Sequence, residues 1–417
     1  MKTRLMIIFL LTLLTGSAAA MGSKTPNIIF IMADDAGYGD LGCYGQKHIK
    51  TPNIDKLAKE GIRFTQAYAG SSVCAPSRST LMTGQHNGHT AARDNVPHYH
   101  TYLEDKDVTI AEVLKQKDYV CGGIGKWSLG DPGTAGSPMN QGFDDWLGYF
   151  NQDHAHYYYT EYLDDGRGKM DLAGNRKSQS SYSHNLLTDR ILEFIREYRE
   201  KPFFMYAAYT LPHFASEKED ETQLPVPSDA PYSNKDWSQR AKNYAAMVSL
   251  LDSDVGRIVR LVDALGLRDN TLIIFTSDNG PWGKLPKDFD SAGGLRGDKR
   301  DLYEGGIRVP FIARWPGVVP EDKTSDEVIA FWDMMPTFAE ISGTKAPKNI
   351  DGTSILGALK GGKVANPHEY LYWDYGHCRR HYDQAVRMGK WKGILRGKKG
   401  EMELYNLKKD VKEQNDV

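Results

Sequence analysis

Cysteine is scarce in this chain, and the few that occur are widely spaced. Among 417 residues there are only four cysteines, Cys43, Cys74, Cys121 and Cys378. This irregular spacing matches neither the framework of a disulfide-stapled domain nor a zinc-binding motif. We therefore expect no disulfide scaffold and no structural zinc, although the sequence leaves open which thiols are free.

Excess charge and long apolar segments are also lacking. Lysine and arginine total 52 against 54 acidic residues, so the formal net charge is −2. Such a balance argues against a nucleic-acid partner, which calls for a basic surface. Beyond residue 20, no segment is long and apolar enough to cross a bilayer, so we expect no membrane span in the mature chain.

The N-terminus departs from this polar character. Lys2 and Arg4 precede the apolar run LMIIFLLTLL at 5–14, and small residues follow, with Ala18 and Ala20 in an A-x-A pattern. This pattern is typical of a secretory signal peptide. The alternative is an uncleaved anchor, for which the run is short. We predict a signal peptide at 1–20 and a periplasmic or secreted mature protein.

Strand and helix patterns alternate along the rest of the chain. Apolar runs predict buried strands, and amphipathic segments between them predict helices. The strands are expected within 27–32, 119–127, 202–214, 271–280 and 309–317, and the main helices within 183–201 and 244–265. This order predicts an α/β fold with a mostly parallel sheet flanked by helices. We expect a catalytic domain at 21–365 and a small, antiparallel β-rich C-terminal subdomain at 366–417.

Oxygen-bearing side chains follow two of these strands. Asp34 and Asp35 come after the first, and Asp278 and Asn279 come after a later one. Parallel strands end at one edge of a sheet, where ligands gather. Crowded carboxylates repel unless a cation lies between them, and an all-oxygen set suits Ca²⁺, or less well Mg²⁺. Alternatively, each stretch is merely a turn.

Cys74 lies in SSVCAPSRSTLMTG, where a loop is expected to become a helix. Pro76 favours the first helical turn, and Ser77 or Ser79 is expected to cap it. A helix N-terminus attracts anions. The thiol could be a small buried side chain or a thiolate nucleophile, and residue types alone leave this open.

The stretch C-A-P-S-R followed by S-T-L-M-T-G resembles the C-x-P-x-R signature of the type I sulfatases. PNIIFIMADDAGYGDLGCYG, GKWSLG, LPHF, TSDNG, LRGDKRDLYEGGIRVP and ELYNLKKD also resemble segments of that family, in the same order. The resemblance covers essentially residues 25 to 410. It implies an alkaline-phosphatase-like fold and a cysteine, here Cys74, that a formylglycine-generating enzyme converts to formylglycine.

The resemblance also implies roles for single residues. Asp34, Asp35, Asp278 and Asn279, together with residue 74, are expected to bind Ca²⁺. Arg78 is expected to orient residue 74, and Lys126 and Lys299 to neutralise sulfate oxygens. His213 is expected to protonate the departing alkoxide. The hydrate of residue 74 would attack sulfur with one hydroxyl and use the other to expel sulfate.

One position departs from the family pattern. Many relatives carry histidine where this chain has Ser128, and serine cannot act as a base at neutral pH. Another group could substitute, release of sulfate could be slower, or His213 could act twice. Since part of the family lacks this histidine, we retain Ser128 as a site candidate.

Substrate-binding candidates are histidines and arginines in three aromatic or polar loops. These are His89, Arg93, His154, His156 and His377. Such residues with nearby tyrosines suit sugar rings and anionic polysaccharide, although packing between domains is an alternative. NQDHAHYYYTEYL, at 151–163, resembles bacterial galactosamine or galactose 6-sulfatases.

The sequence therefore predicts an exported sulfatase that hydrolyses sulfate monoesters of a glycosaminoglycan or algal saccharide. A phosphodiester or phosphonate monoester hydrolase on the same scaffold is one alternative. A non-catalytic saccharide-binding relative is another.

Overall fold

The computed structural model describes residues 25–95, 102–166, 168–216, 219–376, 379 and 381–417. The predicted signal peptide, His377 and Cys378 lie outside these residues. None of the helices in the described part has the length and apolarity that crossing a membrane requires.

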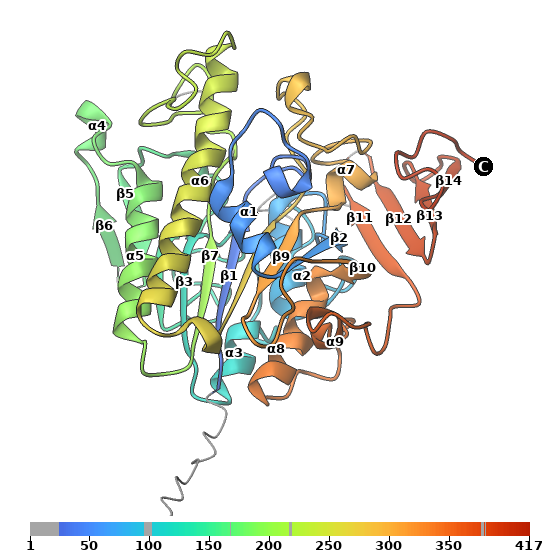
Figure 1. Ribbon diagram of the computed structural model, residues 1–417, viewed down its shortest axis with the longest axis horizontal. Coiled ribbons are helices and arrows are strands. Elements are labelled where there is room, and N and C mark those ends of the chain that lie inside the picture. The colour runs from blue at the N-terminus through green and yellow to red at the C-terminus, as the bar shows by residue number, and fades with distance from the viewer. Residues whose placement is uncertain (1–24, 96–101, 167, 217–218, 377–378, 380) are drawn as a thin grey trace, which may run out of the picture.

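The described chain forms a large sheet covered by helices and a small separate sheet (Figure 1). The large sheet has ten strands in the order β10-β2-β9-β8-β1-β7-β3-β4-β5-β6. Its strands are β1 (Asn27–Ala33), β2 (Ile62–Tyr68), β3 (Val120–Lys126), β4 (Asp145–Tyr149), β5 (Tyr162–Asp165), β6 (Gly168–Asp171), β7 (Phe203–Ala208), β8 (Thr271–Ser277), β9 (Phe311–Arg314) and β10 (Lys323–Ala330).

The central strands β8, β1, β7, β3 and β4 run parallel to one another, whereas β9, β5 and β6 are antiparallel to their neighbours. The helices are α1 (Pro52–Lys59), α2 (Cys74–Thr83), α3 (Ile110–Lys115), α4 (Asn175–Ser178), α5 (Ser183–Glu197), α6 (Gln239–Ala264), α7 (Glu304–Ile307), α8 (Met334–Ser342) and α9 (Leu356–Leu359).

Alternate residues of the central strands pack into two separate cores. Ile29 and Ile31 of β1 face the core formed with α1, α5 and α6. Ile28 and Phe30 face the opposite core, formed with α2, α3 and α8. A strand that is buried on both faces reads as a continuous apolar run, and this explains why the sequence pattern identified these strands.

The second sheet is antiparallel and lies at the C-terminal side of the molecule (Figure 1). Its strands are β11 (Leu371–Tyr375), β12 (Asp383–Met388), β13 (Trp391–Leu395) and β14 (Met402–Asn406). The mostly parallel sheet, its helical cover and this small sheet confirm the predicted fold class. The boundaries at residues 21, 365 and 366 remain predictions.

Candidate functional site

The carboxyl ends of β1 and β8 bring the four predicted oxygen-bearing residues together. These strands are parallel neighbours in which Ala33 pairs with Ser277. The Asp278 amide donates to the Ala33 carbonyl at 3.1 Å, and the Asp35 amide donates to Asp278 Oδ1 at 3.1 Å. Asp35 adopts a left-handed φ of 64°, which aspartate tolerates better than most residues.

Helix α2 places Cys74 opposite these carboxylates. The helix begins at Cys74, and Val73 is its extended N-cap residue, with no side-chain cap. The prediction that Ser77 or Ser79 caps the helix is therefore wrong. Both hydroxyls have tertiary partners instead: Ser77 Oγ donates to the Asp278 carbonyl at 2.5 Å, and Ser79 Oγ contacts Thr90.

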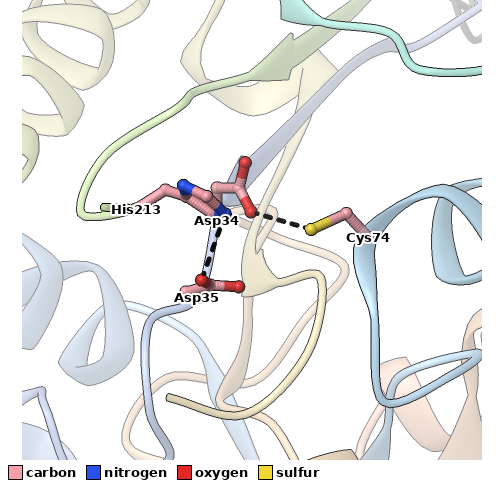
Figure 2. Close-up of side chains that lie close together, drawn as sticks. All are labelled: Asp34, Asp35, Cys74 and His213. Carbon is pink, nitrogen blue, oxygen red and sulfur yellow. Dashed lines mark hydrogen bonds and ion pairs between the residues drawn. The ribbon is translucent and has the colours of Figure 1, made fainter. Parts of the chain in front are cut away.

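The Cys74 thiol points at the Asp34 carboxylate (Figure 2), with Sγ 3.3 Å from Oδ1. The Lys299 ammonium lies 3.4 Å from the same sulfur. Burial, and then the Asp34 charge, raise the pKa of the Cys74 thiol to about 12. An unmodified Cys74 is thus protonated at neutral pH, and this argues against the thiolate nucleophile.

Arg78 ties the nucleophile helix to the strand ends. Its Nη2 and Nε donate to Asp278 Oδ2 at 2.7 and 3.1 Å, and Nη1 donates to the Lys126 carbonyl at 2.5 Å. The guanidinium is fully buried. Burial opposes its charge, but Asp278 and Asp34 hold the pKa of Arg78 above its usual range. Arg78 therefore fixes α2 against β8 and β3, as an orienting residue requires.

Two buried lysines each pair with one aspartate. Lys126 Nζ donates to Asp34 Oδ2 at 2.7 Å, and Lys299 Nζ lies 2.7 Å from Asp35 Oδ1. Burial would raise the pKa of Asp34, but Lys126 and the neighbouring cations hold it well below its ordinary value. Burial likewise opposes the lysine charges, yet Asp34 and Asp35 raise the pKa values of Lys126 and Lys299. Asp34 and the two lysines are therefore ionised at neutral pH.

His213 comes from the loop after β7 and joins the same cluster. Its Nε2 accepts from Lys299 Nζ at 3.0 Å, while Nδ1 donates to the Phe214 carbonyl at 2.6 Å. Burial and Lys299 lower the pKa of His213 to about 4. The ring is thus neutral here. Its expected role as an acid requires a proton on Nε2, and a sulfate anion bound beside the ring would favour one.

The donor atoms of Asp34, Asp35, Cys74 and His213 all lie within 4.8 Å of one another. Asn279 joins them through Nδ2, which donates to Asp35 Oδ1 at 2.7 Å. Its Oδ1 is buried and has no hydrogen-bond partner among the described residues. An orphaned amide oxygen beside several carboxylates suits a divalent cation, so the residues present fit a metal site.

Ser128 lies at the end of β3 but does not reach this cluster through any contact found among the described residues. Its Oγ donates to Gln152 Oε1 at 2.7 Å, and its φ is 65°. Gln152 in turn lines the cleft above the site. Ser128 itself is buried and reaches the cleft lining only through this hydrogen bond to Gln152.

A cleft of about 630 Å³ opens over His213 and Lys299. Its described lining comprises Asn95, Gln152, Asp153, His156, Tyr157, His213, Phe214, Ala215, Ser216, Gln223, Trp282, Lys284, Lys299 and Arg300. Among the predicted substrate-binding residues, His156 lies here, its ring 4.8 Å from that of His213. Burial and His213 lower the pKa of His156 to about 2.

Three other candidates have partners elsewhere. His89 Nδ1 lies 2.9 Å from Asp351 Oδ1, and Arg93 forms an ion pair with the buried Asp374. His154 Nε2 contacts Thr160 Oγ1 at 2.8 Å. The structure does not bring these side chains into the described lining of the cleft, because each already satisfies a neighbouring carboxylate or hydroxyl. Residue types alone do not reveal such partners.

The cleft also contains residues that sequence reasoning missed. Trp282 and Lys284 follow the predicted metal residues Asp278 and Asn279 in the same loop, and Arg300 follows Lys299. Their proximity to predicted site residues was a usable signal. Whether a loop side chain faces the cleft, however, depends on tertiary packing.

Asp40 is a further buried carboxyl, in the loop that follows β1. Its Oδ2 accepts from the Gly37 amide at 2.7 Å and from Tyr244 OH at 2.5 Å. Burial raises the pKa of Asp40 to about 6 from 3.8. The folded state therefore holds this proton more tightly than the unfolded chain does. The contribution of Asp40 to stability is fully present below pH 3.8 and is lost as pH rises through 6.

We accordingly expect the wild type to lose roughly 2 kcal/mol of unfolding free energy relative to Asp40→Asn between pH 4 and pH 7. Denaturant unfolding of both proteins across this range measures the difference. Parallel curves would show that Asp40 does not titrate in this way.

Comparison with known proteins identifies the family. The sequence model of the Sulfatase family matches residues 26–344, and that of the N-sulphoglucosamine sulphohydrolase C-terminal region matches residues 296–417. The chain belongs to the sulfatase family. Human arylsulfatase A is 33% identical over 92% of this chain and 76% of its own length. Human N-acetylgalactosamine-6-sulfatase is 32% identical over 86% of this chain and 70% of its own length.

Solved structures agree with this assignment. The crystal structure of Ps i-CgsB in complex with k-i-k-neocarrahexaose has a TM-score of 0.80 and 29% identity, covering 94% of this chain and 89% of that one. The PsFucS1 sulfatase from Pseudoalteromonas sp. shares the fold, with a TM-score of 0.74, 24% identity, and 94% and 86% coverage. This sulfatase is therefore a sulfuric ester hydrolase of the type I, alkaline-phosphatase-like class.

Proposed function

We propose that this sulfatase is an exported, Ca²⁺-dependent enzyme that hydrolyses sulfate monoesters of a saccharide. The main support for this proposal is the position of Cys74. Its Sγ lies 3.3 Å from Asp34 Oδ1 and 3.4 Å from Lys299 Nζ, below the cleft. The similarity to N-acetylgalactosamine-6-sulfatases and to a carrahexaose complex supports a saccharide substrate. The N-terminal pattern supports export.

Residue 74 is proposed to act as formylglycine, made from Cys74 by a formylglycine-generating enzyme. Its hydrate would supply one hydroxyl for attack on sulfur and a second for the release of sulfate. Asp34, Asp35, Asp278 and Asn279 would hold Ca²⁺, which would polarise the sulfate.

The remaining residues position and protonate the substrate. Lys126 and Lys299 are proposed to stabilise the sulfate oxygens, and Arg78 holds α2 in place. His213, protonated on Nε2 when the sulfate anion is bound beside it, would give that proton to the alcohol oxygen as the S–O bond breaks. The net reaction is R–O–SO₃⁻ plus water, giving R–OH, sulfate and a proton.

The test is turnover of an aryl sulfate and an aryl phosphate diester by the same preparation, followed by sulfate release from a panel of sulfated saccharides. We expect a large preference for the sulfate monoester. A large preference for the diester would make the protein a phosphodiester hydrolase. Binding of saccharides without turnover, in protein that carries the aldehyde, would make it a non-catalytic relative.

Ser128 gives a more specific prediction. We expect Ser128→His to accelerate the sulfate-release step about tenfold, because histidine supplies a base where serine cannot. Histidine also tolerates the left-handed φ of this residue better than most side chains. Pre-steady-state release of sulfate measures the step. An unchanged rate would remove this position from the release mechanism.

A further inference from the structure

Trp282 gathers three cationic side chains on one wall of the cleft. The Arg300 guanidinium lies 5.0 Å from the centre of the indole ring, Lys299 Nζ lies 5.7 Å from it, and Lys284 Nζ lies 5.9 Å from it. All four residues line the cleft. Cation–π attraction offsets part of the repulsion among these charges, so Trp282 holds them in place.

The charges on this wall are not balanced. Lys299 is neutralised by Asp35. For Arg300 and Lys284, no ion pair with another described residue is found, and both side chains are exposed. Asp153 is the one acidic residue in the described lining. The Asp298 carboxyl lies close enough to Arg300 to offset part of its charge. Arg300 and Lys284 nevertheless present cationic groups to the cleft that no ion pair among the described residues holds.

We propose that Arg300 and Lys284 form a second anion subsite, which binds an acidic substituent elsewhere on the saccharide whose sulfate ester lies at residue 74. The position of the substrate in this inference rests on the proposed function. The acidic substituent is a carboxylate or a second sulfate ester. Arg300 can bind either through paired N–H donors, and Lys284 adds a point charge.

Trp282 adds a reason to place a sugar ring here. The partly exposed indole offers apolar area beside the cations, against which a pyranose can pack while the charged groups reach its acidic substituents. The subsite thus favours polyanionic saccharides over singly sulfated neutral ones.

Binding by a protein that cannot turn over tests this proposal. Calorimetry on Cys74→Ala would compare three disaccharides: one with a single sulfate ester and a carboxylate, its carboxyl-reduced counterpart, and a disulfated one. We expect the two ligands with a second acidic group to bind about tenfold more tightly than the carboxyl-reduced one, which keeps only its sulfate ester, because exposed charge pairs contribute up to about fivefold each. Comparing the carboxylate-bearing and the disulfated disaccharide shows which of the two acidic substituents the subsite prefers.

Adding Arg300→Met and Lys284→Met should bring the affinity ratio close to one, whereas Lys287→Met should leave it unchanged. Lys287 is an exposed lysine of the same loop, outside the described lining of the cleft. Raising the salt concentration should also erase the preference, and this needs no variant. The proposal would be overturned if the affinity ratio stayed the same after Arg300 and Lys284 were both replaced. Equal binding of all three ligands would also overturn it.

Turnover of an aryl sulfate by the unsubstituted protein separates this inference from the proposed function. Turnover with no preference for the acidic ligands would refute the subsite alone. Preference that depends on Arg300, without any turnover, would refute the proposed function and leave an anion site.

Discussion

Replacing Cys74 by serine is expected to lower kcat by at least about 10⁴-fold, the scale of loss seen when a nucleophile is removed. The buried Ser128 hydroxyl in the same region cannot substitute, because it is held by Gln152. A serine at position 74 has one hydroxyl and no carbonyl to re-form. It would therefore accept one sulfate group and stop.

The measurement is aryl sulfate turnover together with intact mass. We expect Cys74→Ser to gain the mass of one SO₃ group, and Cys74→Ala to gain none. The midpoint of thermal unfolding should change little in either case, because both side chains are close in size to the thiol they replace. Cys121→Ala is the matched control, since this thiol is also buried but lies in the core with Ala111 as its neighbour. Substantial turnover by Cys74→Ala would refute the assigned nucleophile.

Removing divalent ions should lower activity by about 10³-fold or more, because metal polarisation contributes several kcal/mol to a reaction of this kind. Calcium should restore it. The fold should survive, since the cluster balances its own charges: Asp34, Asp35 and Asp278 pair with Arg78, Lys126 and Lys299. Calcium should nevertheless raise the unfolding midpoint, because it binds only the folded state.

Asn279→Ala sharpens this prediction. Its orphaned Oδ1 is a proposed ligand, so the calcium concentration for half-maximal activity should rise at least about tenfold. Asn185→Ala, an exposed asparagine of α5, is the control. Indifference to chelator, or an unchanged calcium requirement in Asn279→Ala, would contradict the proposed metal site.

The central strands β1, β3, β7 and β8 could be predicted from sequence because their residues are buried on both faces. The short central strand β4 was missed. β2, β5, β6 and β10 were also missed, since they mix buried residues with partly or fully exposed ones and give weaker patterns. The antiparallel direction of β9 was also beyond prediction, because an apolar run carries no information on strand direction.

Some residues of the site could likewise be predicted from sequence order, and others could not. Asp34, Asp35, Asp278 and Asn279 follow strands directly, so their convergence could be argued from sequence order. Lys126, His213 and Lys299 came only from resemblance to a family. The capping prediction for Ser77 and Ser79 failed because tertiary partners took both hydroxyls.

The cleft was the least predictable part. Trp282, Lys284 and Arg300 lie in loops whose course depends on packing. Conversely, His89, Arg93 and His154 had the right chemistry but satisfy neighbouring groups instead.

The chemical state of residue 74 tests the account most directly. The protein is matured with a formylglycine-generating enzyme and shown to be active on aryl sulfate. Mass spectrometry of its tryptic peptide Phe64–Arg78 then measures the chemical state of residue 74. We expect the mass of a residue in which CHO replaces CH₂SH, and this aldehyde should react with a hydrazine. An intact, alkylatable Cys74 thiol throughout a fully active preparation would contradict the account.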